Sequence, residues 1–114
     1  MSTDTLQDIE KQIADAKTFS DLGESLVRLS SNRDFRKVIV DGYLSKEAVR
    51  LVHLKADPAM QKPESQESIV RQIDAIGALS SYFRTVEFQA TLAVNSIASA
   101  EAAREEILAE EIQA

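Results

Sequence analysis

The feature that most constrains this chain is an unbroken helical pattern from Pro63 almost to the last residue. No proline follows Pro63, and a stripe of apolar or small side chains recurs at spacings of three and four: Ile69, Ile73, Ile76, Leu79 or Ser80, Phe83, Val86, Ala90, Ala93 and Ile97. A helix of about 45–50 residues would be about 70–75 Å long. A compact globule of this size has a radius of gyration of only about 13–14 Å. Such a helix must protrude, fold back at a break near Gly77 or Asn95, or lie along other subunits.

The N-terminal residues 1–31 also have helical periodicity. Leu6, Ile9, Ile13 and Ala16 are spaced by three and four, which predicts an amphipathic helix. Ser2, Thr3 or Asp4 can cap its start, and Thr18, three residues before Asp21, supplies a second capping signal. The pattern is consistent with one bent helix or with two short ones.

Residues 32–57 are predicted to form a helical hairpin. Asn32 is a good N-cap for the first helix, and Gly42 is expected to end that helix in the left-handed conformation. Ser45 would then cap a second helix, which stops at the Asp57-Pro58 pair. The run from Val38 to Val40 has strand propensity as well, but no second such run offers it a partner strand.

These segments predict an all-α fold and a single domain over residues 1–114. Short N-terminal helices (1–31) and the hairpin (32–57) would pack antiparallel on the long helix (63–112) as a helical bundle. The residues expected to hold this bundle are Phe35, Val38, Leu51 and Val52 on one side, and Ile69, Ile73, Ile76, Phe83 and Val86 on the other.

Composition argues against most chemistry. The chain has no cysteine and one histidine, His53, which excludes disulfides, thiolate ligands and two-histidine metal sites. Asp57 lies one turn after His53, yet no nucleophile is placed beside them, so we expect no catalytic residue, cofactor, metal or small-molecule substrate. The longest uncharged run, Phe88–Ala100, is 13 residues long, too short to span a bilayer. We therefore expect neither a membrane-spanning nor a targeting segment.

The formal charge of −6 is unevenly distributed along the chain. Residues 1–27 carry −4, residues 28–62 carry +4, residues 63–100 carry −2 and residues 101–114 carry −4. A basic middle between acidic ends favours complementary contacts, within one chain or between copies. The alternative is that these charges lie on the solvated faces of ordinary helices.

A family resemblance adds to this pattern. Residues 32–44 read NRDFRKVIVDGYL and residues 47–52 read EAVRLV. This order resembles small helical proteins encoded by tailed bacteriophages, which have an acidic-aromatic-basic start, a Val/Ile pair, Gly-Tyr, an Ala-Val-Arg-Leu helix and a long Ile-rich helix. The resemblance extends over most of residues 32–112. It implies a virion-associated or morphogenesis protein made in the host cytoplasm, and it carries no site residue over.

We therefore expect a non-enzymatic structural or assembly protein, a minor virion component bound to capsid, portal or tail subunits or to itself. The residues expected to contact partners are Arg33, Arg36, Lys37 and Arg50, which would face an acidic surface, and Ile107, Leu108 and Ile112, which would enter an apolar groove. One alternative is a helix-turn-helix DNA-binding protein of the bacterial cytoplasm, with residues 32–56 on DNA and the long helix as an oligomerisation arm. A small host-directed inhibitor is a third possibility.

Overall fold

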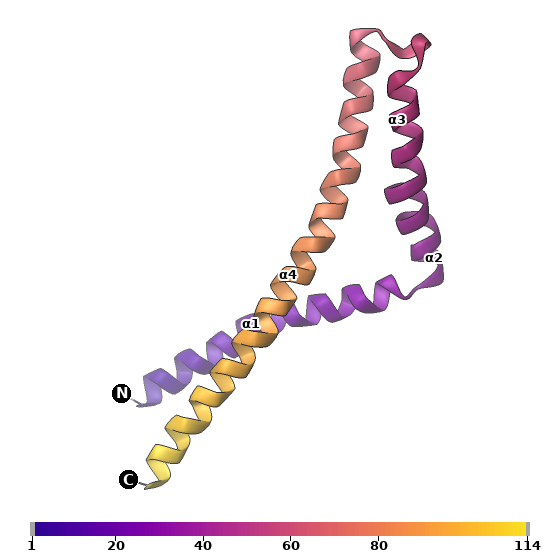
Figure 1. The fold of residues 1–114 in the computed structure, drawn as a ribbon. Coiled ribbons are helices and arrows are strands. Elements are labelled where there is room, and N and C mark those ends of the chain that lie inside the picture. Colours follow the sequence, from indigo (N-terminus) through magenta and orange to yellow (C-terminus); the bar gives the residue numbers. More distant parts are fainter. Residues whose placement is uncertain (1, 114) are drawn as a thin grey trace. The chain divides into compact units, whose positions relative to one another are not determined.

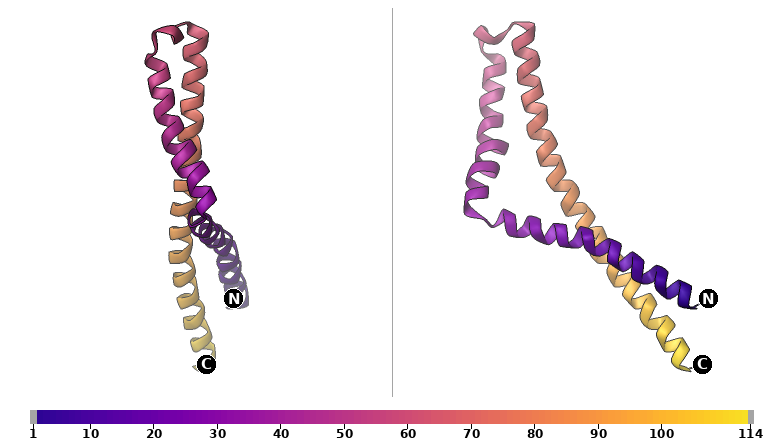
Figure 2. Two further views of the ribbon diagram at one scale, coloured as in Figure 1. Left: turned by 90° about the vertical axis from the view of Figure 1, so that its right-hand side faces the viewer. Right: turned by 180° about the vertical axis from the view of Figure 1, so that it is seen from behind.

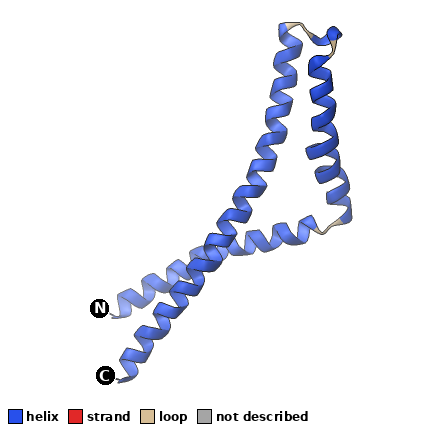
Figure 3. Ribbon diagram, in the orientation of Figure 1, coloured by secondary structure: helices blue, strands red, loops and turns tan. Residues whose placement is uncertain are grey.

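A computed structural model describes residues 2–113, and every element in that range is helical (Figures 1 and 3). In chain order the elements are α1 (Ser2–Ser30), α2 (Arg33–Phe35), the π-helix η1 (Arg36–Glu47), α3 (Ala48–Ala56), the 3₁₀ turn η2 (Pro58–Met60) and α4 (Pro63–Gln113). The predicted all-α class is confirmed. None of the helices in the described range is long and apolar enough to cross a membrane.

The N-terminal segment forms one helix, α1, and not two. The predicted capping signal at Thr18 does not start a new helix, since α1 continues through it to Ser30. Next to it, the hydroxyl of Ser20 donates to the carbonyl of Lys17 one turn back (3.1 Å). A hydroxyl that bonds within its own helix leaves the backbone ladder intact. Half-buried and buried positions then follow one stripe along α1: Leu6, Ile9, Ile13, Ala16, Ser20 and Gly23.

The predicted hairpin within residues 32–57 is wrong, because the chain stays helical through Gly42. Asn32 does cap the helix as predicted, with its Oδ1 accepting from the Phe35 N–H (2.9 Å). Gly42 does not adopt a positive φ, and it lies inside η1, where a Cβ would stand 3.1 Å from the carbonyl oxygen of Lys37 five residues earlier. The i→i+5 bonds of a π-helix bring those residues together. No turn separates α2 from α3.

The turn of the actual hairpin lies between α3 and α4, where several polar groups hold it. Oδ1 of Asp57 accepts from the Ala59 N–H (2.8 Å), which ends α3 where it was predicted to end. Nε2 of Gln66 donates to the carbonyls of Lys55 (2.9 Å) and Met60 (2.8 Å). The hairpin therefore consists of α2, η1 and α3 on one side and the start of α4 on the other.

The long helix α4 begins at Pro63, as predicted, and continues to Gln113 without a break. Neither Gly77 nor Asn95 interrupts it. A Cβ built on Gly77 would meet nothing within 4 Å, so this glycine is an ordinary helical residue with open space around it.

The residues group into two compact units, each of which contains part of α4. The middle unit comprises residues 27–85, and the terminal unit comprises residues 1–26 with residues 86–114. In the middle unit, α3 lies beside the N-terminal part of α4 (Figure 1). In the terminal unit, α1 runs antiparallel to the C-terminal part of α4 (Figure 2).

Leu51, Ile69 and Ile76 form the core of the middle unit. The residues that pack around this core are Tyr43, Leu44, Ala48, Leu54, Met60 and Ile73. Phe35 meets Phe83 edge to face, with ring centroids 6.0 Å apart. The predicted inward positions Phe35 and Leu51 are confirmed.

Two other predicted core positions of the middle unit, Val38 and Val52, are wrong. Both are exposed. The looser winding of η1 turns Ile39 and Val40 into half-buried positions in place of Val38. Val52 follows the fully buried Leu51 directly, and successive residues of a helix point about 100° apart.

Half of the buried apolar residues described for the terminal unit are alanines. Its buried apolar residues are Ile13, Ala16, Leu26, Val86, Ala93 and Ala100. A Cβ on Gly23 would lie under 3.0 Å from the Cβ of Ala90, so the two backbones approach closely only because position 23 has no side chain. Val86, which was predicted to hold the same bundle as Ile69, belongs to this unit instead.

Candidate interaction surfaces

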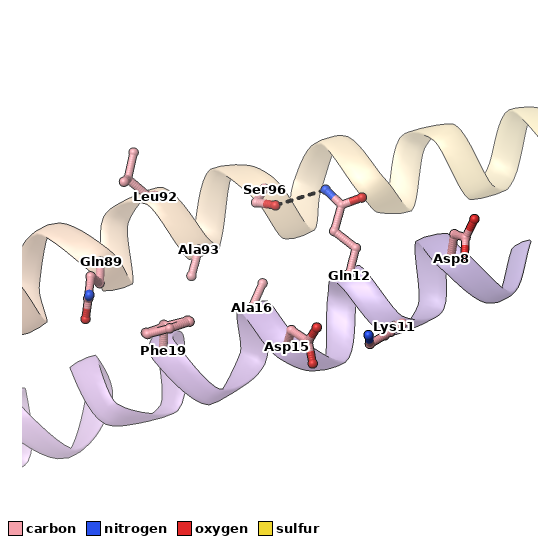
Figure 4. Close-up of a pocket in the computed structure, with 10 residues that line it drawn as sticks. All are labelled: Asp8, Lys11, Gln12, Asp15, Ala16, Phe19, Gln89, Leu92, Ala93 and Ser96. Atoms are coloured by element: carbon pink, nitrogen blue, oxygen red, sulfur yellow. Dashed lines mark hydrogen bonds between the residues drawn. The ribbon is translucent and has the colours of Figure 1, made fainter. Parts of the chain in front are cut away.

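The terminal unit carries an apolar groove of about 510 Å³ between α1 and α4 (Figure 4). The residues that line it are Asp8, Lys11, Gln12, Asp15, Ala16 and Phe19 from α1, and Gln89, Leu92, Ala93 and Ser96 from α4. Ala16 and Ala93 point toward the opposite helix and form the floor (Figure 4). Nε2 of Gln12 donates to Oγ of Ser96 across the groove (3.2 Å).

Large apolar side chains stand at the edge of this groove and remain open to solvent. Phe19 is 43% exposed and Leu92 is 52% exposed. Leu22 and Phe88, each one turn or less from these residues along its helix, are exposed as well. An apolar patch of this kind on a small helical unit is typical of a surface that binds another protein.

The charge that surrounds the groove is acidic. The terminal unit carries twelve acids and three bases, a formal charge of −9, whereas the middle unit carries ten bases and seven acids, a formal charge of +3. At the groove itself, Asp8 and Asp15 flank the single base Lys11. The uneven charge found in the sequence therefore coincides with the division into units.

A second apolar surface lies on the outer face of α3 in the middle unit. Val49 is 54% exposed and Val52 is 61% exposed, while Leu51 between them is 1% exposed and packs in the core. The bases that flank the two valines, within one turn of them along the helix, are Lys46 at the end of η1 and Arg50 and Lys55 in α3, and all three are exposed. This outer face of α3 is apolar at its centre and basic at its margins.

The basic residues predicted to contact a partner lie at two places in the middle unit. Arg33, Arg36 and Lys37 are exposed within the first turn of the α2–η1 helix. Arg50 lies in α3, where its guanidinium donates to the carboxylate of Glu47. That hydrogen bond lowers the pKa of Glu47 and raises the pKa of Arg50.

The apolar residues predicted to contact a partner lie near the end of α4 in the terminal unit. Ile107 is half-buried, whereas Leu108 and Ile112 are exposed. These three residues and the basic residues belong to different units.

The residues weighed for chemistry have ordinary structural positions. His53 is exposed on α3, and Asp57 holds the turn after α3 through the Ala59 N–H. Across residues 2–113, no group of three or more His, Asp or Glu side chains could hold a metal ion.

The groove was missed at the sequence level, although a signal for it exists. Ala16 and Gly23 are seven residues apart on α1, and Ala93 and Ala100 are seven apart on α4. Small residues repeated at this spacing on two helices indicate backbones that approach closely. Phe19 and Leu92, which border the small residues, would then be recognised as the walls of a surface depression.

The terminal unit thus offers an apolar groove in an acidic surrounding, and the middle unit offers a helix face that is apolar at its centre and basic at its margins. The predicted contact residues Arg33, Arg36 and Lys37, and Leu108 and Ile112, are exposed as well. All of these features suit contacts with other protein chains. Comparison of the chain with protein-family models, with curated proteins and with solved structures gave no match.

Proposed function

We propose that this chain is a non-enzymatic structural or assembly protein, a minor component of a tailed-phage virion that binds other head or tail subunits. The observation that carries the proposal is the amount of large apolar side chain left uncovered. The most exposed of these residues are Val27, Val38, Val49, Val52, Tyr82, Phe88, Leu92, Val94 and Ile112. Within residues 4–113, for which burial is described, only Leu51 and Ile69 are large side chains with full burial. Exposed apolar surface on this scale is what subunit contacts cover.

The small buried area of the terminal unit also supports contacts with other subunits. Alanine buries little apolar area, and burial contributes about 25 cal/mol per Å². Three of the six buried apolar residues described for this helix pair are alanines, so its own contacts stabilise it less than larger buried side chains would. In this proposal the helical bundle expected from the sequence is completed in the virion, where neighbouring subunits cover the exposed faces of α1, α3 and α4.

The phage assignment is supported by the resemblance of residues 32–44 and 47–52 to small helical phage proteins. The exposed bases Arg33, Arg36 and Lys37 would meet an acidic subunit surface. Leu108 and Ile112 would enter an apolar groove of a partner subunit. Ile107, which is half-buried, would extend that contact inward.

Fractionation of phage particles tests the proposal. The chain carries a small tag and is expressed in cells during phage infection. Particles are separated on a density gradient, and each band is probed for the tag. We expect the wild-type chain in the particle band and the variant with both Leu108→Glu and Ile112→Glu at the top of the gradient. The matched control, Asn95→Glu with Ser99→Glu, places the same two charges at the same spacing on exposed polar positions of α4 and is expected to stay with particles. A wild-type chain that never bands with particles, heads or tails would contradict the proposal.

A DNA-binding protein remains the alternative, although the helix that continues through Gly42 removes the helix-turn-helix expected over residues 32–56. The specific observation that favours it is the exposure of Arg33, Arg36, Lys37 and Arg50 on one continuous helix. Retention of duplex DNA that weakens with salt, and that is lost when Arg36 and Arg50 are changed to Ala, would favour DNA binding. Under the structural proposal, we expect no such retention of duplex DNA, with or without the changes of Arg36 and Arg50 to Ala.

A further inference from the structure

We propose that copies of this chain associate head to tail, with the outer face of α3 in one copy docked in the groove of the terminal unit of the next copy. This inference rests on the proposed function, because it names one of the protein contacts that an assembly protein makes. It concerns the purified chain alone, so it can be tested without any phage particle.

The groove has the form of a helix-binding surface. Its floor is made of the small residues Ala16 and Ala93, and its walls carry Phe19 and Leu92. The lining of α1 extends from Asp8 to Phe19, a stretch of about 17 Å at 1.5 Å per residue. A floor of alanines between larger apolar residues admits the side chains of a third helix, as in helix-in-groove recognition.

The outer face of α3 matches this groove in length and in polarity. Val49 and Val52 are three residues apart, so they stand side by side on one face of the helix. The flanking bases extend from Lys46 to Lys55, which is about 14 Å of helix. Both valines are more than half exposed, so docking would remove apolar surface from water on both partners.

Charge decides which surface of a second copy fits the groove. Two terminal units carry −9 each, so a symmetric contact between two grooves would bring like charges together. The middle unit carries +3 and places its bases around Val49 and Val52. Complementary charge selects partner and register. The groove is therefore expected to bind α3 of another copy and not another groove.

A contact between two different surfaces is heterologous, and repetition of it gives a ring or a filament. Each copy then uses two surfaces, the groove and α3. A contact centred on one short helix covers less than the roughly 800 Å² per partner of a standard interface. The association is therefore expected to be weak and to depend on concentration, as suits a subunit that accumulates locally during assembly.

Two variants separate the surfaces. Leu92→Lys places a base in the groove, where it would be desolvated and would face the bases of α3. Val49→Glu places an acid on α3, where it would face the acidic terminal unit. Both positions are more than half exposed, so the variants are expected to keep the helical circular dichroism of the wild type. Val94→Lys and Val70→Glu are matched controls with the same charge changes on exposed positions of α4 outside both surfaces.

The mass of each purified chain is measured by sedimentation equilibrium over a range of concentrations, alone and in mixtures. We expect the wild type and both controls to form species larger than a dimer, and each groove or α3 variant to be monomeric at the same concentrations. An equal mixture of the Leu92→Lys and Val49→Glu chains is expected to double the monomer mass, because one intact groove then meets one intact α3.

The salt dependence of the wild type gives an independent readout. Between 0.1 M and 1 M salt the Debye length falls from about 10 Å to about 3 Å, so association through opposite charges is expected to weaken at least tenfold in Kd. A wild-type chain that is monomeric throughout, an association that strengthens with salt, a Val49→Glu chain that still associates, or a mixture that stays monomeric would each overturn the proposal. A chain that bands with phage particles while remaining monomeric would overturn only head-to-tail association and would leave the structural function standing.

Discussion

Replacement of Gly23 by alanine tests the close approach of α1 and α4 in the terminal unit. In the middle of an exposed helix, Gly→Ala stabilises by about 1 kcal/mol, because alanine has less backbone freedom to lose on folding. At Gly23, the added Cβ would lie under 3.0 Å from the Cβ of Ala90 and 3.7 Å from its Cα. Overpacking of this kind costs about 1–3 kcal/mol. The net expectation for Gly23→Ala is a loss of about 0–2 kcal/mol.

Gly77 supplies the matched control, because it is also a helical glycine with no positive φ. A Cβ at Gly77 would meet no atom within 4 Å. Gly77→Ala should therefore show the propensity gain alone, about 1 kcal/mol. In a domain of this size, 1 kcal/mol corresponds to a change in Tm of about 4 °C or more. Thermal melts followed by circular dichroism at 222 nm should separate the two variants, with Gly77→Ala above the wild type and Gly23→Ala at or below it.

A double-mutant cycle shows whether Ala90 is the cause. Ala90→Gly alone should cost about 1 kcal/mol of helix propensity. Combined with Gly23→Ala it should restore most of the stability, because the methyl group then lies on the other helix. The coupling between the two positions is expected to be about 1–3 kcal/mol. Equal increases in Tm for Gly23→Ala and Gly77→Ala, or a cycle without coupling, would refute the close approach of the two backbones.

Three further predictions concern the middle unit. Leu51→Ala should lower the free energy of unfolding by about 3 kcal/mol, because the side chain is fully buried. Val52→Ala, at the exposed neighbouring position, should change it by less than about 0.5 kcal/mol. Urea titration followed by circular dichroism compares the two variants, and equal losses would contradict the assigned core. Gln66→Ala removes hydrogen bonds to two backbone carbonyls in the turn and should cost about 1–2 kcal/mol in the same assay, a loss that an unordered turn would not show. The Glu47 carboxyl should titrate below its ordinary pKa, because it accepts a hydrogen bond from Arg50. A lowered acid pKa contributes stability above the unfolded-state value that is lost as the pH falls through the folded-state value. NMR titration should therefore show the Glu47 pKa return toward its ordinary value in Arg50→Gln, and an unchanged pKa would exclude the pairing.

The sequence predicted helix starts and caps correctly where a single residue type determines the local backbone hydrogen bonds. Pro63 starts α4 because proline lacks an N–H and fits the first helical turn. Asn32 and Asp57 cap helices because their side-chain oxygens reach free N–H groups. Each of these signals acts over a few residues, so no knowledge of the tertiary structure is needed to interpret it.

Gly42 shows where such signals stop being sufficient. Glycine permits a positive φ but does not require it, and at Gly42 the chain continues as a π-helix. The prediction of Val38 as a core residue failed for a related reason. It assumed the α-helical period, whereas the wider winding of η1 leaves Val38 exposed and places Ile39 and Val40 in half-buried positions. Local composition carries little information about such a change of winding, because tertiary packing selects it.

The sequence did not predict which helix packs against each part of α4. The buried stripe follows the spacings four, three, four and three from Ile69 to Phe83, takes one additional step of three to Val86, and then resumes the alternation. This change of phase falls where the middle unit gives way to the terminal unit, and a three-residue step of this kind marks a local change in helix packing. Periodicity alone identifies the face that is buried, but not the helix that buries it.

The size of the buried side chains distinguishes the two helices that pack against α4. Bulky residues such as Ile69 and Ile76 meet the η1–α3 helix in the middle unit, and small residues such as Ala93 meet α1 in the terminal unit. A second helix can approach an alanine of α4 closely where it has an equally small residue itself, and α1 places Gly23 against Ala90. Pairing by size therefore explains why α1 packs against the C-terminal part of α4. It also explains why a depression with apolar walls remains between the two helices.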